Sequence, residues 1–379
     1  MTTELDKLFQ EFESGPKCFM DEAALHRRPL LIYGAGTTGK LVFRVLSEAG
    51  YVVDAFLDAA AKPNASWQGI PVYHPNDPCL SNEQRGRAHV VLCVFNAFAE
   101  LAPIVGNLRQ LGFKSITTYL DFHPSFAREL GDCYWLTSRS FYAAQRQQCQ
   151  AANELWSDET SRTLYLAILR LRLLGDHAVL PVPDTKDQYF PADLPGYRQP
   201  LRFIDCGAYH GDTLEQVLAH GLALAAVAAF EPDDGNFVAL SRYAVAHRDT
   251  LPKDVFLFPC GVDGTARKVR FSSGQGYSSR LDSAGDTLIQ CAAIDEALPG
   301  FAPTFIKMDI EGAELGALWG ARRTIIEHQP ALAISLYHQP AHLWQLPLLV
   351  ANWYGNRATY HLRSHGCNGF ELVLYVRPT

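Results

Sequence analysis

Short apolar runs that end in glycine or in a polar residue alternate with helical patterns along the first third of the chain. Residues 28–33 form such a run, and the segment after it has apolar residues at helical spacing as far as Gly50. Further strand-like runs follow at residues 52–58, 69–73, 89–94 and 115–119. Strands that alternate with helices predict a parallel, doubly wound α/β sheet, and we assign this first domain to residues 1–125.

The pattern changes in the next part of the chain. Leu164, Ile168 and Leu171 recur at helical spacing, and several prolines interrupt regular structure between residues 181 and 195. We therefore predict a helical connector followed by an arm, over residues 126–187.

A second series of strand-like runs begins beyond the arm. These runs lie at residues 203–205, 255–258, 305–309 and 331–338, and two runs with the spacing of an antiparallel pair close the chain at residues 358–362 and 370–376. We predict a second α/β domain over residues 188–379.

Composition narrows the class of protein. Apolar residues make up 48% of the 379 residues and charged residues 19%, which is typical of a soluble globular protein. The net charge of −7, without a large lysine or arginine cluster, argues against a nucleic-acid partner. There is no signal-peptide pattern and no apolar run near the roughly 18 residues of a membrane span, so we expect a cytoplasmic protein. The sequence leaves the oligomeric state open and is compatible with a homo-oligomer.

The nine cysteines are scattered along the chain and include no C-x-x-C pair. An odd number without paired spacing predicts reduced thiols rather than a disulfide framework or a zinc knuckle.

The most informative motif is in residues 203–213, which read FIDCGAYHGDT. An apolar strand stops at Asp205, turns through Gly207 and Gly211 and enters a helix, an arrangement that brings backbone close to a small ligand. The next apolar run ends at Glu231, 26 residues after Asp205, about the length of one strand, helix and strand. A carboxylate at that place can accept hydrogen bonds from both ribose hydroxyls, so we predict a nucleoside site.

The same loop indicates which nucleoside it binds. It lacks a lysine followed by Ser or Thr, which argues against a triphosphate with magnesium. S-adenosylmethionine has a ribose and no phosphate, and it fits the motif better. In this interpretation Glu231 receives the ribose hydroxyls, while Asp205 orients the turn and the methionine amine. The alternative is that both acids only cap helices.

Three further motifs follow in order: residues 230–233 read FEPD, residues 306–314 read IKMDIEGAE and residues 336–340 read LYHQP. Together with residues 205–213 they resemble the FkbM family of S-adenosylmethionine-dependent methyltransferases, and the resemblance covers roughly residues 188–378. It implies a seven-stranded methyltransferase sheet whose last strand is antiparallel. It also implies acceptors among sugars, surface glycans and polyketide-type metabolites.

Asp309 and His338 each close a predicted strand, at the same sheet edge as Asp205 and Glu231. A sugar-type hydroxyl is a poor nucleophile until its proton leaves. Because methyl transfer also requires alignment of the acceptor, we predict Asp309 and His338 as the catalytic residues.

The charged residues around Asp309 have two interpretations. Lys307, Asp309 and Glu311 share one side of the strand if it stays extended. If extension ends at Asp309, Glu311 and Glu314 fall in the first turn of a helix, where carboxylates are favourable without function. We favour this second interpretation for Glu314, and Lys307 is also placed to pair with Asp309.

A metal is a further alternative. His338 and His342 have an i, i+4 spacing, but Pro340 between them disfavours a shared helix, and two histidines without a third ligand make a poor zinc site. We predict no metal. Carboxylates such as Asp309 and Glu311 could instead hold magnesium or calcium, which we consider the weaker hypothesis.

In the first domain, Gly34, Gly36 and Gly39 match G-x-G-x-x-G, and Asp58 ends the next strand, where an acid would bind ribose. Leu41 occupies the Ser or Thr position of a P-loop and argues against that motif. This half is similar to the Rossmann-like domains that precede catalytic modules in polysaccharide-biosynthesis enzymes. The resemblance implies binding of NAD or a nucleotide sugar, or a scaffold that has lost its ligand.

We therefore predict two doubly wound Rossmann-like α/β domains joined by a helical connector, and an S-adenosylmethionine-dependent O-methyltransferase that acts on a hydroxyl of a sugar, glycan or polyketide-type acceptor. One alternative is a nucleotide-sensing or glycan-assembly scaffold that binds cofactor without turnover. Another is an NAD-dependent oxidoreductase centred on the first domain, although that half lacks a Tyr-x-x-x-Lys pair.

Overall fold

The computed structural model of the chain describes residues 3–15, 20–272, 280–281 and 287–379. The chain forms two compact units, each of which draws on more than one segment of the sequence. Unit 1 comprises Met1–Arg146, Leu166–Pro183 and Gly366–Phe370, and unit 2 comprises Gln147–Tyr165, Asp184–His365 and Glu371–Thr379. The limits of the two domains and the connector that we expect from the sequence stay a prediction.

Unit 1 is built on a six-stranded sheet with the order β3-β4-β2-β1-β5-β6. Its strands are β1 (Leu30–Tyr33), β2 (Ala55–Leu57), β3 (Ser66–Trp67), β4 (Ile70–Tyr73), β5 (His89–Leu92) and β6 (Ser115–Thr118). All neighbouring strands run parallel except the short β3, which is antiparallel to β4. This confirms a parallel α/β sheet in the first part of the chain.

Helices of unit 1 bury apolar faces, and those that follow β1 and β6 pack against this sheet. In α2 (Thr37–Glu48), for example, Val42, Val45 and Leu46 are buried. The other helical elements of unit 1 are α1 (Glu4–Ser14), η1 (Glu22–His26), α3 (Asn82–Arg87), α4 (Leu101–Gln110), α5 (Tyr119–Phe122), η2 (His123–Ser125), α6 (Ala127–Leu130), α7 (Arg139–Ala143), η3 (His177–Val179) and η6 (Cys367–Gly369).

Unit 2 contains a seven-stranded sheet with the order β16-β17-β15-β14-β7-β8-β9. These strands are β7 (Leu201–Cys206), β8 (Leu224–Phe230), β9 (Asp254–Phe258), β14 (Phe305–Met308), β15 (Ala331–Ser335), β16 (Ala358–Ser364) and β17 (Leu372–Pro378). The last strand, β17, lies between β15 and β16 and is antiparallel to both. The expected seven-stranded sheet with an antiparallel last strand is therefore confirmed.

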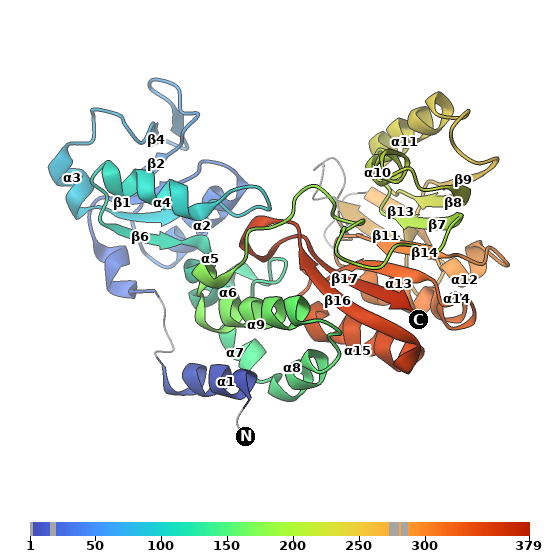
Figure 1. Cartoon of the computed structure of the whole chain (residues 1–379). Coiled ribbons are helices and arrows are strands. Elements are labelled where there is room, and N and C mark those ends of the chain that lie inside the picture. Colours follow the sequence, from blue (N-terminus) through green and yellow to red (C-terminus); the bar gives the residue numbers. More distant parts are fainter. Residues whose placement is uncertain (1–2, 16–19, 273–279, 282–286) are drawn as a thin grey trace. The chain divides into compact units, whose positions relative to one another are not determined.

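The helices of unit 2 cover both faces of its sheet. Because β8 and β15 lie on opposite sides of the β7–β14 pair, right-handed crossovers place their connecting helices on opposite faces. Helices α10 and α11 accordingly lie on one side of the sheet and α13 and α14 on the other (Figure 1). The helical elements are α10 (Asp212–Ala219), α11 (Asp234–Ala246), α12 (Ile294–Ala297), α13 (Glu314–Gly320), α14 (Arg322–His328), α15 (His342–Tyr354) and η5 (Gly355–Arg357).

Unit 2 also contains a four-stranded sheet, with the order β10-β13-β11-β12. Its strands are β10 (Gly261–Val262), β11 (Arg267–Ser272), β12 (Arg280–Leu281) and β13 (Thr287–Ala292). Helices α8 (Arg146–Asn153) and α9 (Glu159–Leu174) contain residues of both units.

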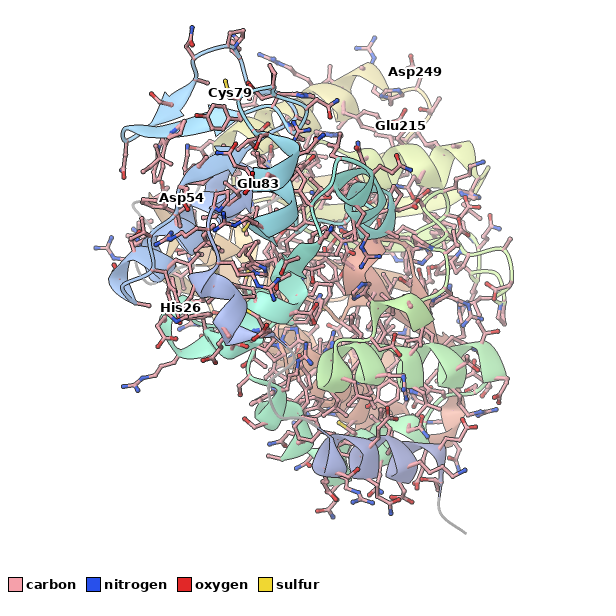
Figure 2. The ribbon with its side chains drawn as sticks, turned by 90° about the vertical axis from the view of Figure 1, so that its left-hand side faces the viewer. His26, Asp54, Cys79, Glu83, Glu215 and Asp249 are labelled. Atoms are coloured by element: carbon pink, nitrogen blue, oxygen red, sulfur yellow. The ribbon has the colours of Figure 1, made fainter. Side chains whose placement is uncertain are left out.

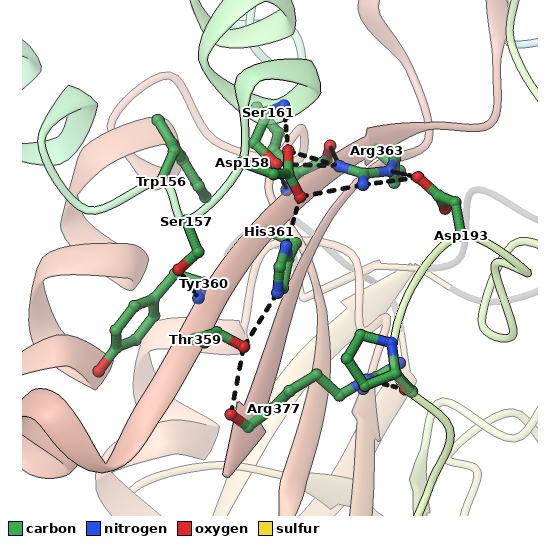
Figure 3. A network of polar contacts seen from close by, with 12 residues as sticks. Trp156, Ser157, Asp158, Ser161, Asp193, Thr359, Tyr360, His361, Arg363 and Arg377 are labelled. Atoms are coloured by element: carbon green, nitrogen blue, oxygen red, sulfur yellow. Dashed lines mark hydrogen bonds and ion pairs between the residues drawn. The ribbon is translucent and has the colours of Figure 1, made fainter. Parts of the chain in front are cut away.

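The segment that leads into α9 closes the outer edge of strand β16 (Figure 3). Ser157 exchanges two hydrogen bonds of 2.9 Å with the backbone of Tyr360. The carboxylate of Asp158 lies 2.5 Å from His361 Nδ1 and 3.1 Å from Arg363 Nη2. An uncovered edge strand could pair with another chain, so this polar network protects the sheet.

Within the described part of the chain, no helix is both long and apolar enough to cross a lipid bilayer. Eight cysteines lie in the part of the chain that the structure describes. Cys79 is exposed on unit 1 (Figure 2), whereas Cys93, Cys149, Cys206, Cys260 and Cys291 are buried.

Candidate active site

The turn after β7 is the central element of the candidate site. Gly207 has a φ of +82°, and a Cβ atom there would lie only 2.0 Å from the backbone oxygen of Asp309. Gly211 has a φ of +98° and precedes α10, and a Cβ there would lie 3.0 Å from the ring of Tyr243. Both positions therefore require glycine, as the motif predicts.

Glu231 follows β8 and closes one side of this turn. It is 5% exposed, and its Oε2 accepts a 2.8 Å hydrogen bond from the amide of Tyr209. Its Oε1 accepts a 2.9 Å hydrogen bond from the amide of Asp233. Burial raises the pKa of Glu231 above its ordinary value, although the two amides oppose this shift. Each oxygen of a carboxylate can accept a second hydrogen bond, so both retain capacity for ligand hydroxyls.

Asp205 lies in β7 directly beside Lys307 of β14. The Lys307 Nζ atom is 3.2 Å from Oδ1 of Asp205 and donates a 2.6 Å hydrogen bond to the backbone oxygen of Gly207. Burial opposes the charge of Lys307, but the carboxylates of Asp205 and Asp309 outweigh it and raise the pKa of Lys307. Lys307 thus pairs with Asp205 rather than with Asp309, and it fixes the turn by its bond to Gly207.

Asp309 follows the last residue of β14 and retains 22% exposure of its side chain. Its Oδ2 accepts a 2.8 Å hydrogen bond from the hydroxyl of Tyr189, a buried residue of the segment that leads into β7. The Nζ atom of Lys307 lies 5.3 Å from the centre of the Tyr189 ring, within the range of a cation–π contact. The segment before β7 therefore supplies part of the site, and no sequence motif marks it.

His338 lies behind Asp309 and is 4% exposed. Its Nδ1 is 2.7 Å from Oε1 of Glu314, which is fully buried, and its Nε2 is 3.4 Å from Oδ1 of Asp309. Burial alone would lower the pKa of His338, but the carboxylates of Glu314 and Glu311 outweigh it and raise this pKa to about 10. Burial would in turn raise the pKa of Glu314, but His338 lowers it to about 2.

Two more acidic side chains adjoin this group. Glu311 has a φ of +54°, so the strand ends before it, and its Oε2 lies 3.6 Å from His338 Nε2. Glu371, at the start of β17, accepts hydrogen bonds of 2.6 Å from Gln188 and 3.1 Å from Tyr337. Burial raises the pKa of Glu311 to about 8 and that of Glu371 to about 7. No motif in the sequence marks Glu371, because it lies 62 positions after Asp309 in a hairpin.

Glu314 is the first residue of α13, as the helical interpretation predicts. It also contacts His338, which the sequence alone did not indicate. Ligand atoms of Asp309, Glu314 and His338 all lie within 4.8 Å of one another, a spacing that a small cation could bridge. The same side chains already form the ion pairs described above. We assign no metal to this group, and its metal content stays a prediction.

The glycine motif of unit 1 also adopts a turn, which is tightly packed at Gly39 and open at Gly36. A Cβ at Gly39 would lie 1.8 Å from the backbone oxygen of Gly34, whereas no atom lies within 4 Å of a Cβ at Gly36. The carboxylate of Asp58 accepts a 2.9 Å hydrogen bond from the amide of Ala35. The structure thus brings Asp58 to the glycine turn.

The residues at the carboxyl ends of strands β7 and β8 fit S-adenosylmethionine. Gly207 and Gly211 form a tight turn with positive φ, and Glu231 beside this turn has hydrogen-bonding capacity for a ribose. Asp205 has a different environment, since it is fully buried against Lys307.

Comparison with known proteins gives the family of this part of the chain. Residues 205–363 match the family model described as the methyltransferase FkbM domain. A crystal structure of methyltransferase FkbM from Methylobacillus flagellatus KT superposes with a TM-score of 0.78 at 21% sequence identity, covering 98% of both chains. This similarity establishes a shared fold over nearly the whole chain.

Two other solved structures are more distant. An rRNA methylase from Streptococcus thermophilus is 11% identical over 46% of this chain and 85% of its own, with a TM-score of 0.29. A ribosomal protein L11 methylase from Lactobacillus delbrueckii subsp. bulgaricus is 13% identical over 48% and 71%, with a TM-score of 0.27. We draw nothing from scores this low, and no curated protein matches the chain.

The match to the family model covers the turn after β7, Glu231 and Asp309. Residues 205–363 are therefore a methyltransferase FkbM domain, and the protein is an S-adenosylmethionine-dependent methyltransferase.

Proposed function

We propose that unit 2 transfers the methyl group of S-adenosylmethionine to a hydroxyl oxygen of a sugar, glycan or polyketide-type acceptor. The observation that carries this proposal is the position of the Gly207 turn between two carboxylates. The amide of Tyr209 in this turn bonds Glu231, and Gly207 packs against the backbone of Asp309. Glu231 would hold a nucleoside at the same turn against which the backbone of Asp309 packs.

The cofactor residues have distinct roles in this proposal. Glu231 accepts the ribose hydroxyls, and Gly207 and Gly211 give the turn beside it its positive φ and close packing. Asp205 is bound to Lys307 at 3.2 Å, so it orients the turn rather than reaching far toward the ligand. S-adenosylmethionine, when bound, supplies an electrophilic methyl group on a sulfonium.

The chain supplies alignment and a route for the acceptor proton. As the new C–O bond forms, the C–S bond breaks with its electron pair left on sulfur, and the hydroxyl proton passes to a carboxylate. Asp309 is the carboxylate that we propose, because its side chain keeps 22% exposure whereas that of His338 keeps 1%. The buried His338 orients Asp309 rather than touching the acceptor.

Asp309→Asn tests this role. The change is nearly isosteric, so affinity for S-adenosylhomocysteine by calorimetry should stay the same while turnover falls about 100-fold. Turnover is measured as transfer of labelled methyl from S-adenosylmethionine to a panel of free sugars, glycans and polyketide-type alcohols. Asp249→Asn, at an exposed position of the same unit (Figure 2), is the control.

Two outcomes would contradict the proposal. Equal loss of cofactor affinity and turnover in Asp309→Asn would place Asp309 in the nucleoside pocket. Tight binding of S-adenosylhomocysteine without transfer to any acceptor in the panel would favour the scaffold hypothesis.

We also propose that unit 1 binds a nucleotide such as NAD or a nucleotide sugar. Supporting this, the carboxylate of Asp58 and the open position of Gly36 lie at one glycine turn, after β1 and β2. A ribose acid beside a glycine turn is the arrangement of dinucleotide sites.

A further inference from the structure

We propose that Glu314 is a positioning residue of the methyltransferase site, and that it holds the His338 imidazole so that Nε2 faces the Asp309 carboxylate. The inference rests on the methyl transfer at Asp309 that is proposed above. It adds a buried residue that acts through His338 and does not touch the acceptor.

The geometry of the imidazole gives the first step. Glu314 is fully buried, and its Oε1 lies 2.7 Å from Nδ1 of His338, so Nδ1 carries a hydrogen that Glu314 accepts. Nε2 lies on the opposite side of the ring, 3.4 Å from Oδ1 of Asp309. Fixing Nδ1 therefore fixes the direction of Nε2.

The Asp309 carboxylate is held from two sides as a result. Tyr189 donates to Oδ2 at 2.8 Å, while the His338 ring faces Oδ1. When both carboxylate oxygens are held, the exposed part of the Asp309 side chain has one orientation toward an acceptor. This is the alignment that an in-line transfer needs.

The charges around His338 have one dominant sign. The Glu314 carboxylate faces His338 from α13, and the carboxylates of Asp309 and Glu311 face it from the loop after β14. Glu371, at the start of β17, interacts electrostatically with His338. These carboxylates favour the doubly protonated, cationic imidazole. His342 shares Glu314, with its Nδ1 3.4 Å from Oε2. A cation here attracts Asp309 and fixes it.

Glu314 also has a structural contact that the test must separate. Its Oε1 accepts a 3.0 Å hydrogen bond from the amide of Ile310, near the start of its own helix. Asp295 provides a matched control in the same unit, because its carboxylate accepts 2.8 Å hydrogen bonds from the amides of Arg323 and Thr324 at the start of α14.

The first experiment is a double-mutant cycle in the full chain with Glu314→Gln, His338→Gln and the double variant. We expect each single change to lower kcat about tenfold or more, the loss expected for one hydrogen bond to a charged group, with affinity for S-adenosylhomocysteine unchanged. The double variant should be no slower than the slower single variant, because both residues act on Asp309 as a unit. Asp295→Asn should leave kcat unchanged.

The second experiment reads the imidazole directly. In protein labelled with ¹⁵N-histidine, the His338 signals are assigned by their loss in His338→Gln. The parent should show a His338 imidazolium at pH 7, and Glu314→Gln should show a neutral ring or a mixture. The conservative Glu314→Asp variant is expected to restore part of the charged form.

Three results would overturn the inference: unchanged kcat in a folded Glu314→Gln variant, fully multiplicative losses in the double variant, or a neutral His338 in the parent. If circular dichroism shows that Glu314→Gln does not fold, the ¹⁵N-histidine spectrum of the parent and the kcat of Glu314→Asp test the inference instead. A parent that transfers no methyl group to any acceptor would defeat the proposed function, whereas its His338 spectrum would still test the placement by Glu314.

Discussion

The hydroxyl of Tyr189 donates a 2.8 Å hydrogen bond to Oδ2 of Asp309, although the two residues are 120 positions apart in the sequence. Tyr189 lies in the segment before β7, and Asp309 follows β14. The contact brings a residue outside the four motifs into the group that we propose to align the acceptor.

Tyr189→Phe removes only this hydroxyl and keeps the ring in the core. Because a hydrogen bond to a charged group contributes about 1.5 to 3 kcal/mol, we expect kcat to fall about tenfold or more. Affinity for S-adenosylhomocysteine should change little. Steady-state kinetics and calorimetry measure both quantities.

The control for this change is Tyr354→Phe, which removes a buried hydroxyl that donates to the backbone of Pro330 at 2.6 Å. It should lower stability without affecting kcat. If the two variants had the same kcat as the parent, Tyr189 would have only a packing role.

Glu231→Ala removes the carboxylate that we assign to the ribose. Each lost charge-assisted bond should weaken binding of S-adenosylhomocysteine by roughly 10- to 100-fold, as measured by calorimetry. Glu215→Ala, at an exposed site on α10 (Figure 2), should bind like the parent. Unchanged affinity in a folded Glu231→Ala variant would remove the basis of the cofactor assignment.

Gly36→Val tests the glycine turn of unit 1. A side chain there enters space that no other atom of the protein occupies within 4 Å, so folding should survive while a bound dinucleotide is blocked. Thermal melting of parent and variant is measured with NAD, UDP-sugars and S-adenosylhomocysteine added separately. A ligand at about 100 times its dissociation constant stabilises by about 2.7 kcal/mol.

The expected pattern is a shift of the parent with NAD or a UDP-sugar that the variant loses, and an equal shift of both proteins with S-adenosylhomocysteine. A parent that responds to S-adenosylhomocysteine but to neither NAD nor UDP-sugars would favour a scaffold role for unit 1.

Asp158→Asn tests the network at the edge of β16 (Figure 3). Burial opposes the charge of Asp158, but Arg363 and His361 outweigh it and hold the pKa of Asp158 well below its ordinary value of 3.8. A carboxyl whose pKa is lower in the folded state stabilises the protein above the unfolded-state pKa, and this contribution is lost as the pH falls through the folded-state pKa.

We therefore expect Asp158→Asn to lower the free energy of unfolding by about 2 kcal/mol at pH 7, and by less at pH 3. Urea unfolding at the two pH values gives both numbers. Asp249→Asn changes an exposed acid and should have no effect at either pH. A difference from the parent that was the same at pH 3 and pH 7 would show that charge is not the cause.

The sequence by itself predicted two α/β domains, and it placed several polar residues at the ends of their strands; the seven-stranded sheet was implied by the family resemblance, and the four-stranded sheet was not predicted. Apolar strands that stop at Asp205, Glu231 and Asp309 predict side chains at one sheet edge, because parallel strands end on the same side. The glycines at 207 and 211 were also predictable, since a backbone turn with positive φ is encoded within a few residues. Strand ends and glycine turns are encoded by neighbouring residues, and the structure contains both as predicted.

The tertiary structure alone decided which side chains meet at that edge. Lys307 pairs with Asp205 because the register of β14 against β7 places them side by side. Glu314 reaches His338, 24 residues away, because a turn with left-handed backbone at Glu311 precedes its helix. Tyr189 comes from the segment before β7 and Glu371 from a hairpin, and only packing brings these two segments to the site. Periodicity and turn chemistry are set by residues a few positions apart, whereas these contacts depend on the register and packing of distant elements. The motifs therefore predicted where the site lies, and only the tertiary structure determined which side chains contact one another there.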